Sequence, residues 1–175
     1  MEVYFDYWVG WRRVAAYAFR RNWEFVKLRY LNWASFDDEM FEVLCYDIVY
    51  HNSKFDKNTI RKMGKWRSRD GGRGIVVFTK PAFGEKPKKY IFQCKLSGRE
   101  KSINTSNVGS VSDVIDQYRA DGYGLMCNCY IDSTLFYRLD GISDRRGINI
   151  ETWSGFEIER FLSRRPLLKQ RYEIT

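Results

Sequence analysis

Two apolar runs, separated by a segment that disfavours regular structure, constrain the fold of this chain most. Ile75–Phe78 is a continuous run of β-branched and aromatic residues, and a second apolar run occupies residues 90–96. Between the runs, residues 81–89 read PAFGEKPKK, and their two prolines and one glycine favour a turn. Short apolar runs bounded by turn signals are typical of buried strands. The sequence therefore predicts a hairpin of two largely buried strands.

Helical periodicity precedes this hairpin. Apolar residues recur at helical spacing over residues 36–49 and form one face. Ser35 stands where a helix N-cap is expected, and the acidic residues that follow it suit the positive end of a helix dipole. The connection after this helix is polar and basic, with room for a short helix at residues 57–63.

Helices and strands alternate after the hairpin. A helix capped by Ser110 or Ser112 is expected to end near Gly122. The remaining expected elements are a strand at 123–130, a helix at 133–142, a strand at 148–153 and a helix at 155–162. This order predicts one α/β domain with a mixed sheet flanked by helices.

Composition agrees with a folded domain and excludes several classes of protein. The chain has 175 residues, of which 44% are hydrophobic and 30% are charged. No apolar run approaches the roughly 20 residues of a membrane span, and the N-terminus lacks a basic-then-apolar signal pattern. We therefore expect a cytoplasmic protein with no membrane partner. A single histidine, His51, makes a Ser-His-Asp triad or a histidine-rich zinc site improbable.

Positive charge is concentrated in one stretch of the chain. The formal net charge is +8, whereas residues 54–101 alone carry fifteen basic and four acidic groups. Such an excess favours a polyanionic partner, and a nucleic acid is the partner expected here. The residues expected to contact DNA phosphates are Lys65, Arg67, Arg69 and Arg73. A solvated basic loop is the alternative interpretation.

Aromatic residues are concentrated at the N-terminus, within an extension of residues 1–35. Twelve of the thirty aromatic residues fall in the first 36 positions, interleaved with two arginine pairs. Interleaved aromatic and arginine side chains can stack on bases and bind phosphate. Packing against a core or a partner subunit is the interpretation we favour for this segment.

Three separated positions carry the side chains needed for metal-assisted chemistry. Glu42 lies on the predicted first helix, Asp70 precedes the first strand of the hairpin, and Gln93 and Lys95 end its second strand. Residues two apart share a face of a strand, so Gln93 and Lys95 are expected to point the same way. Carboxylate and amide oxygens suit a hard cation such as Mg²⁺, and a nearby lysine can hold or deprotonate a water.

These residues resemble the restriction-endonuclease-like fold of PD-(D/E)xK nucleases, and within it the Mrr-type endonuclease domains. The resemblance covers residues 36–165, after which residues 166–175 form a basic tail. The matching pieces are FEVLC (41–45), DGGRGI (70–75), FQCKLS (92–97), SDVIDQY (112–118), DGYGLM (121–126) and GINIETWSGFEIERFL (147–162).

The resemblance implies a DNA endonuclease that hydrolyses phosphodiesters with Mg²⁺ or Mn²⁺, in restriction or phage defence. It implies catalytic roles for Lys95 and Gln93, and metal binding by Glu42, Asp70 and Gln93. Gln117 is expected to face the same cleft and contact DNA. Assembly as a homodimer, or into a larger defence complex through the N-terminal segment, is also expected.

One position departs from this pattern. The motif before the lysine strand usually reads DGGxD, and its second Asp binds the metal, but here Gly74 occupies that position. Four extended residues span about 13 Å, so Asp70 cannot simply replace the missing carboxylate. The alternative function is therefore a catalytically inactive module that binds DNA or assembles a larger complex.

Overall fold

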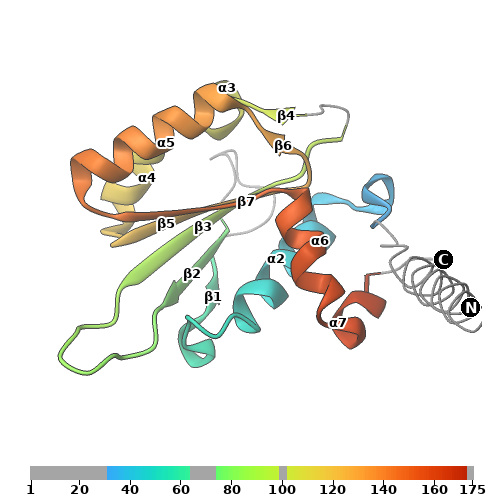
Figure 1. The fold of residues 1–175 in the computed structure, drawn as a ribbon, viewed down its shortest axis with the longest axis horizontal. Helices are drawn as coiled ribbons and strands as arrows, with labels where there is room; N and C mark the ends of the chain where they lie inside the picture. The colour runs from blue at the N-terminus through green and yellow to red at the C-terminus, as the bar shows by residue number, and fades with distance from the viewer. Residues whose placement is uncertain (1–30, 64–73, 99–101, 173–175) are drawn as a thin grey trace, which may run out of the picture. The chain divides into compact units, whose positions relative to one another are not determined.

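A five-stranded mixed sheet with helices on both faces forms the centre of the structure (Figure 1). The structure is a computed structural model that describes residues 31–63, 74–98 and 102–172. All of these residues belong to a unit that spans Leu31–Thr175. The prediction of an α/β domain with a mixed sheet flanked by helices is confirmed.

The sheet places the strand with the Gln-x-Lys motif at its middle. The strand order is β1 (Arg61–Lys62), β2 (Ile75–Phe78), β3 (Lys89–Lys95), β5 (Gly122–Cys127) and β7 (Asn149–Trp153). The first three strands pair antiparallel, whereas β3, β5 and β7 run parallel. A separate two-stranded sheet pairs β4 (Ser102–Ile103) with β6 (Tyr130–Ile131).

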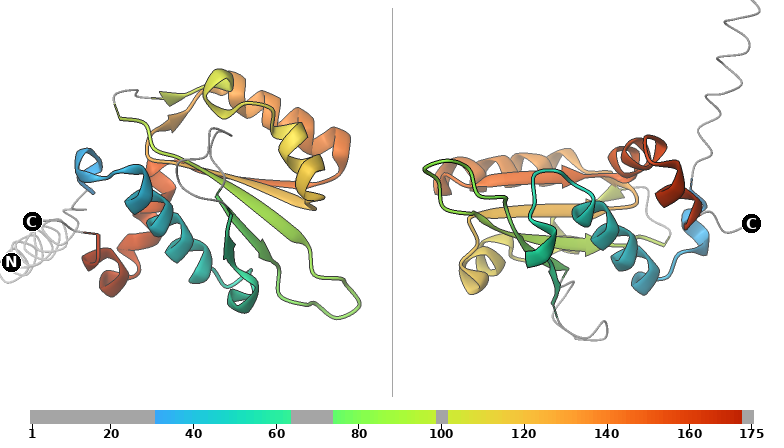
Figure 2. Two further views of the ribbon diagram at one scale, coloured as in Figure 1. Left: turned by 180° about the vertical axis from the view of Figure 1, so that it is seen from behind. Right: turned by 90° about the horizontal axis from the view of Figure 1, so that it is seen from below.

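Different helices cover the two faces of the five-stranded sheet (Figure 2). One face packs against α2 (Asp38–Tyr50) and α6 (Gly155–Ser163), with α7 (Pro166–Gln170) beside them. The other face packs against α3 (Thr105–Val108), α4 (Val111–Tyr118) and α5 (Ser133–Arg146). Short 3-10 helices, η1 (Trp33–Ser35) and η2 (Lys57–Thr59), flank α2 in the chain. None of the helices in the described part of the chain is long and apolar enough to cross a membrane.

The alternation of side chains along β3 separates two apolar clusters. Tyr90 and Phe92 belong to the cluster beneath α2, whereas Ile91 belongs to the cluster beneath α4. This period of two follows from strand geometry, and it determines which helix each residue of β3 faces.

Two glycines in β5 leave room for the aromatic rings of β3. Gly122 pairs with Tyr90 and Gly124 pairs with Phe92. A Cβ at Gly122 would lie 2.5 Å from the Tyr90 ring, and one at Gly124 would lie 2.1 Å from the Phe92 ring. The two rings stack with centroids 6.2 Å apart, and Phe55 meets each of them edge-on. The rings therefore occupy volume that side chains on β5 would otherwise fill.

The C-terminal residues are tied to α2. The Tyr172 hydroxyl donates a hydrogen bond of 2.5 Å to Asp47 Oδ2, and Arg171 Nη1 donates one of 2.7 Å to the same oxygen. Tyr172 is buried, and its ring stacks on Phe36 with centroids 6.3 Å apart. Residues 166–172 of the expected basic tail therefore form a short helix followed by the buried Tyr172.

Several local expectations were wrong. Asp37, not Ser35, caps α2, because its Oδ1 accepts the Met40 amide at 2.7 Å. The short helix expected at 57–63 ends at Thr59, and Arg61–Lys62 instead pairs with β2 as β1. The single strand expected at 123–130 is divided, since β5 ends at Cys127 and Tyr130–Ile131 joins a different sheet. Of the two capping residues considered for α4, Ser110 is the one that accepts the Asp113 amide.

Gly124→Ala should destabilise the protein strongly, because its methyl group would overlap the Phe92 ring. We expect the free energy of unfolding to fall by about 1–3 kcal/mol, the usual cost of overpacking. Denaturant unfolding measures this change. Gly98→Ala is the control, since a Cβ there meets nothing within 4 Å, and equal losses for the two variants would contradict the expected overlap.

Candidate functional site

The N-terminal half of α2 packs on the carboxyl-terminal end of β3. The contact centres on two thiols, since Cys45 of α2 hydrogen-bonds with Cys94 of β3. Burial raises the pKa of the Cys45 thiol well above its ordinary value, so this thiol remains a neutral packing group. Glu42 lies three residues before Cys45 and acts on it electrostatically, while Lys95 directly follows Cys94. Lys95 is linked to the same helix through Asp38 at its start, whose carboxylate acts on the Lys95 ammonium group.

Glu42 is partly buried on α2. Burial raises the pKa of its carboxyl group above the ordinary value, and the nearby Glu39 adds to this effect. Lys62 of β1 acts in the opposite direction and favours the charged form. A carboxylate that is poorly solvated in this way gains more than an exposed one from an added cation.

Lys95 is half-buried at the end of β3. Burial lowers the pKa of its ammonium group, and the Asp38 carboxylate at the start of α2 partly offsets this shift. A lysine with a lowered pKa has a larger neutral fraction near pH 7, and only the neutral amine can accept a proton.

Gln93 has quite different neighbours. It is 3% exposed, and the Tyr123 hydroxyl donates a hydrogen bond of 2.5 Å to its Oε1. Its Nε2 donates one of 3.2 Å to the Val108 carbonyl. Burial raises the pKa of Tyr123, which keeps the hydroxyl protonated and able to donate. Gln93 thus contacts β5 and α3, whereas Glu42 is surrounded by groups of α2 and β1.

Gly74 directly precedes β2 and lies close to the backbone of β3. It is buried, and its carbonyl accepts a hydrogen bond of 3.1 Å from the Met63 amide. A Cβ at this position would lie 1.9 Å from the Phe92 carbonyl oxygen and 3.1 Å from Cys94 Sγ. The first of these contacts is with backbone, so no side chain fits at position 74 unless a strand moves.

Five of the expected site residues fall outside the described residues. They are Asp70, expected to bind metal, and the expected phosphate contacts Lys65, Arg67, Arg69 and Arg73. Gln117 is described and lies exposed on α4, on the face of the sheet opposite α2. The part of the chain with assigned structure therefore holds Glu42, Gly74, Gln93 and Lys95 of the expected centre.

The oxygen atoms of the described site residues are of the type that binds a hard cation, but there are too few of them. Glu42 and Gln93 offer the carboxylate and amide oxygens that Mg²⁺ prefers. However, residues 31–63, 74–98 and 102–172 contain no group of three acidic, thiol or imidazole side chains that could hold a metal ion. The Gln93 oxygen also already accepts the Tyr123 hydroxyl. Described residues alone do not complete a metal site.

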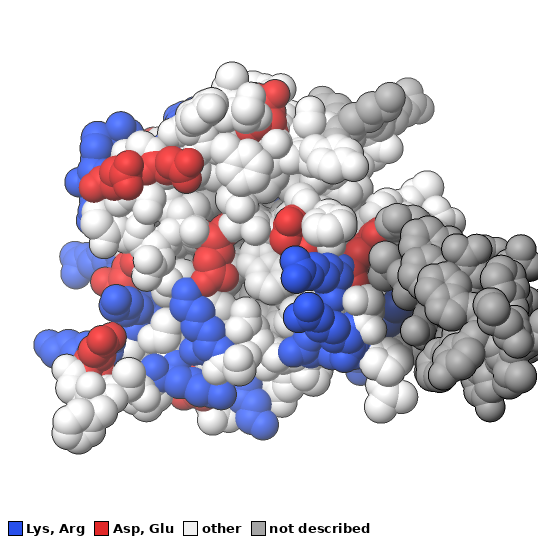
Figure 3. Space-filling view, viewed as in Figure 1, with Lys and Arg blue, Asp and Glu red and all other residues white. Residues whose placement is uncertain are grey.

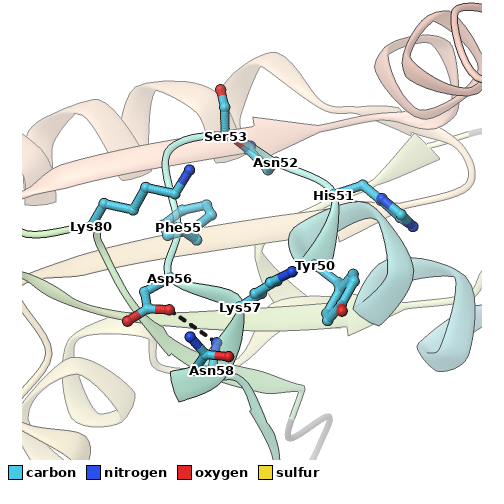
Figure 4. Close-up of a pocket in the computed structure, with 9 residues that line it drawn as sticks. All are labelled: Tyr50, His51, Asn52, Ser53, Phe55, Asp56, Lys57, Asn58 and Lys80. Atoms are coloured by element: carbon cyan, nitrogen blue, oxygen red, sulfur yellow. Dashed lines mark hydrogen bonds between the residues drawn. The ribbon is translucent and has the colours of Figure 1, made fainter.

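A separate pocket opens near the C-terminal end of α2 (Figure 4). Its volume is about 490 Å³, and its walls come from the end of α2, the loop that follows it, η2, and Lys80 after β2. Tyr50 offers an aromatic surface there, and Lys57 and Lys80 place ammonium groups around the opening. This pocket is distinct from the centre around Glu42, which lies in the N-terminal half of the same helix.

Comparisons with known proteins found two similar solved structures. One is the DNA modification-dependent restriction endonuclease AspBHI, with a TM-score of 0.49 and 15% identity over 73% of this chain. The other is the MspJI restriction endonuclease in complex with a 27-mer oligonucleotide, with a TM-score of 0.48 and 13% identity over 76% of this chain. The match spans 31% and 28% of those chains, which is less than a third of either.

No family model and no curated protein sequence matches the chain. Similarity to solved structures at the level found does not establish membership of a family.

Three residues near the centre were not foreseen from the sequence. Tyr123 orients Gln93, Asp38 acts on Lys95, and Lys62 acts on Glu42. Asp38 stands out in the sequence only as a residue suited to a helix start. Lys62 could not be found because the short strand that carries it has no apolar pattern.

Gly74→Ala and Gly74→Asp should both destabilise the protein, since each adds a Cβ against the Phe92 carbonyl. We expect each to lower the free energy of unfolding by at least about 1 kcal/mol. Thermal or denaturant unfolding measures the loss. A Gly74→Asp variant as stable as the wild type would contradict the close approach and would show that a carboxylate fits here.

Asp38→Asn should lower the pKa of Lys95 further, because it removes the carboxylate that favours the charged ammonium. An NMR titration of the lysine side-chain signals follows this pKa. Glu39→Gln is the matched control, since Glu39 is adjacent in sequence but does not act on Lys95. A Lys95 pKa that is unchanged or raised in Asp38→Asn would contradict the assigned pairing.

Proposed function

We propose that this chain is a nuclease-type domain that acts on DNA and hydrolyses phosphodiester bonds in a metal-dependent reaction. One observation carries the proposal: Lys95 is half-buried at the carboxyl end of β3 near Asp38 of α2, Glu42 is partly buried on the same helix, and burial shifts the pKa of each towards the neutral form. Ionisable groups perturbed by burial at the carboxyl end of a strand are characteristic of reactive sites. A setting in restriction or phage defence is part of this proposal.

The chain's own residues have distinct roles in the proposed reaction. Lys95 holds the attacking water and accepts its proton, which its lowered pKa favours. Glu42, Gln93 and Asp70 would hold a Mg²⁺ or Mn²⁺ ion, and Tyr123 fixes the orientation of the Gln93 oxygen. Bound there, the cation would neutralise phosphate charge and lower the pKa of a water.

The proposed partner is DNA, and the charge of the chain supports it. Residues 54–101 carry an excess of eleven positive charges, and the hairpin between β2 and β3 lies within them. Lys65, Arg67, Arg69, Arg73 and Gln117 are proposed to contact the DNA. Assembly as a homodimer, or into a larger complex through residues 1–35, is a proposal for the whole protein.

A second function is favoured by a specific observation. Because position 74 lacks space for any side chain, the usual metal-binding Asp cannot stand there in this backbone. The Gln93 oxygen is, in addition, engaged by Tyr123. Both features suit a module that binds DNA without cutting it.

DNA cleavage by the purified chain in Mg²⁺ and Mn²⁺ tests the proposal. Lys95→Ala should reduce the cleavage rate by about 100-fold or more, the usual contribution of a group that accepts a proton. Lys95→Arg should fail equally, because it keeps the charge but cannot deprotonate. Glu42→Gln should also fail, since it removes a carboxylate charge from the site.

Asp140→Asn is the control for Glu42, because it removes an exposed carboxylate from α5, on the other face of the sheet. Full cleavage by Lys95→Ala would contradict the role given to Lys95. An uncut substrate that the chain still binds, and releases as salt is raised, would favour the inactive module. Absence of both cutting and DNA binding would overturn both functions.

A further inference from the structure

The connection between β2 and β3 is a projecting arm. It extends beyond the end of the sheet in Figure 1 and in the left view of Figure 2. At its base, the Thr79 amide donates to the Lys88 carbonyl and the Lys88 amide donates to Thr79 Oγ1, each at 2.9 Å. Nearer its tip, Ala82 pairs with Glu85, whose amide donates to the Ala82 carbonyl at 3.1 Å. Hydrogen bonds thus join the two sides of the arm at its base and near its tip.

The tip presents one aromatic side chain to solvent. Phe83 is 108% exposed, the largest exposure of any large hydrophobic residue in the described ranges. It precedes Gly84, whose φ of +76° suits the third position of a tight turn. Phe83 therefore stands at the outer corner of the turn and points away from its own strands.

The sides of the arm are basic. Lys80, Lys86 and Lys88 are all exposed there, together with a single acidic residue, Glu85. Basic side chains gather over the arm and the neighbouring loops at the lower left of the surface in Figure 3. Lys80 also lines the pocket that contains Tyr50 and Lys57, so the basic surface continues from the arm into that pocket.

From this arrangement we propose that the arm binds nucleic acid, with Phe83 stacked on or inserted between bases and Lys80, Lys86 and Lys88 on flanking phosphates. The inference rests on the proposed function, because it takes DNA as the substrate. Apolar wedges flanked by cations are a general means of binding and bending duplex DNA, and bases stack on aromatic rings without sequence preference.

Two features favour DNA over a protein strand as the occupant. Pro81 and Pro87 lie on the two sides of the arm and lack amide protons, which hinders edge-to-edge pairing with another strand. The three lysines match the regular negative charge of a phosphate backbone. A protein partner would be expected to cover more apolar surface than one phenylalanine.

The arm also has a defined relation to the proposed catalytic centre. Phe83 precedes Lys95 by twelve residues, a stretch that leads from the tip of the arm to the end of β3. At about 3.3 Å per residue, their Cα atoms are at most about 40 Å apart, a length slightly greater than one turn of duplex DNA. The arm and the centre are therefore close enough to contact the same duplex.

DNA binding by Phe83→Ala tests the stacking role. Fluorescence anisotropy with a labelled duplex should show an affinity loss of about 5- to 150-fold, the range measured for removing one stacked base contact. A duplex with 2-aminopurine at the contacted step should become brighter with the wild type and remain quenched with the variant. Phe156→Ala is the control, since Phe156 is an exposed phenylalanine on α6.

The triple variant Lys80→Gln, Lys86→Gln, Lys88→Gln tests the phosphate contacts. It should reduce the slope of log affinity against log salt by about 2 to 3, which corresponds to three lost phosphate contacts. Thermal unfolding should be unchanged for every arm variant, because the substituted side chains are exposed. Arg138→Gln, on α5, is the control for a basic residue outside the arm.

The outcomes separate this inference from the proposed function. If the wild type cuts or binds DNA and the arm variants do so with equal affinity and salt slope, the arm inference is overturned and the function stands. If the arm variants lose binding to anionic vesicles but not to DNA, the arm is a membrane contact and the inference fails. If the wild type does not bind DNA, both proposals fall.

Discussion

The close contact between the aromatic rings of β3 and the glycines of β5 is the constraint on which the rest of the structure depends. Tyr90 and Phe92 lie over Gly122 and Gly124, and this leaves their rings flat against the sheet. Phe41, Leu44 and Ile48 of α2 belong to the same buried cluster. The depth at which α2 packs therefore depends on these glycines, and the position of Glu42 depends on α2. A change of one methyl group in β5 acts on the candidate site through this helix.

The central strand also divides the candidate site between two environments. Gln93 points into the cluster beneath α4 and is held by neutral hydrogen bonds, whereas Glu42 and Lys95 lie where burial is incomplete and charge is opposed by Lys62 and Asp38. Neutral hydrogen bonds fix position, and incomplete burial shifts proton affinity. The first environment suits orientation and the second suits reactivity.

The sequence was sufficient to predict the elements with strong apolar patterns, and insufficient where contacts between distant segments decide the structure. Periodicity and turn residues were enough to predict three features: the helix that ends at Tyr50, the two strands of the hairpin, and the alternating helices and strands after Ser110. The strand Arg61–Lys62 carries no pattern, because its pairing with β2 alone defines it. Gly74 could be recognised as a departure from a motif, but the reason for a glycine there is the Phe92 carbonyl, which belongs to another strand. The partner of Gln93 was hidden for the same reason, since Tyr123 is 30 residues away in the chain.

The ring contact between Phe36 and Tyr172 brings the two ends of the described chain together. These residues lie near the first and last described positions, and both pack against α2. The polypeptide thus enters and leaves the folded unit at neighbouring points. Units with adjacent ends can be inserted into a surface loop of another protein without separating the two halves of the host. Such a fold can be gained or exchanged as a cassette.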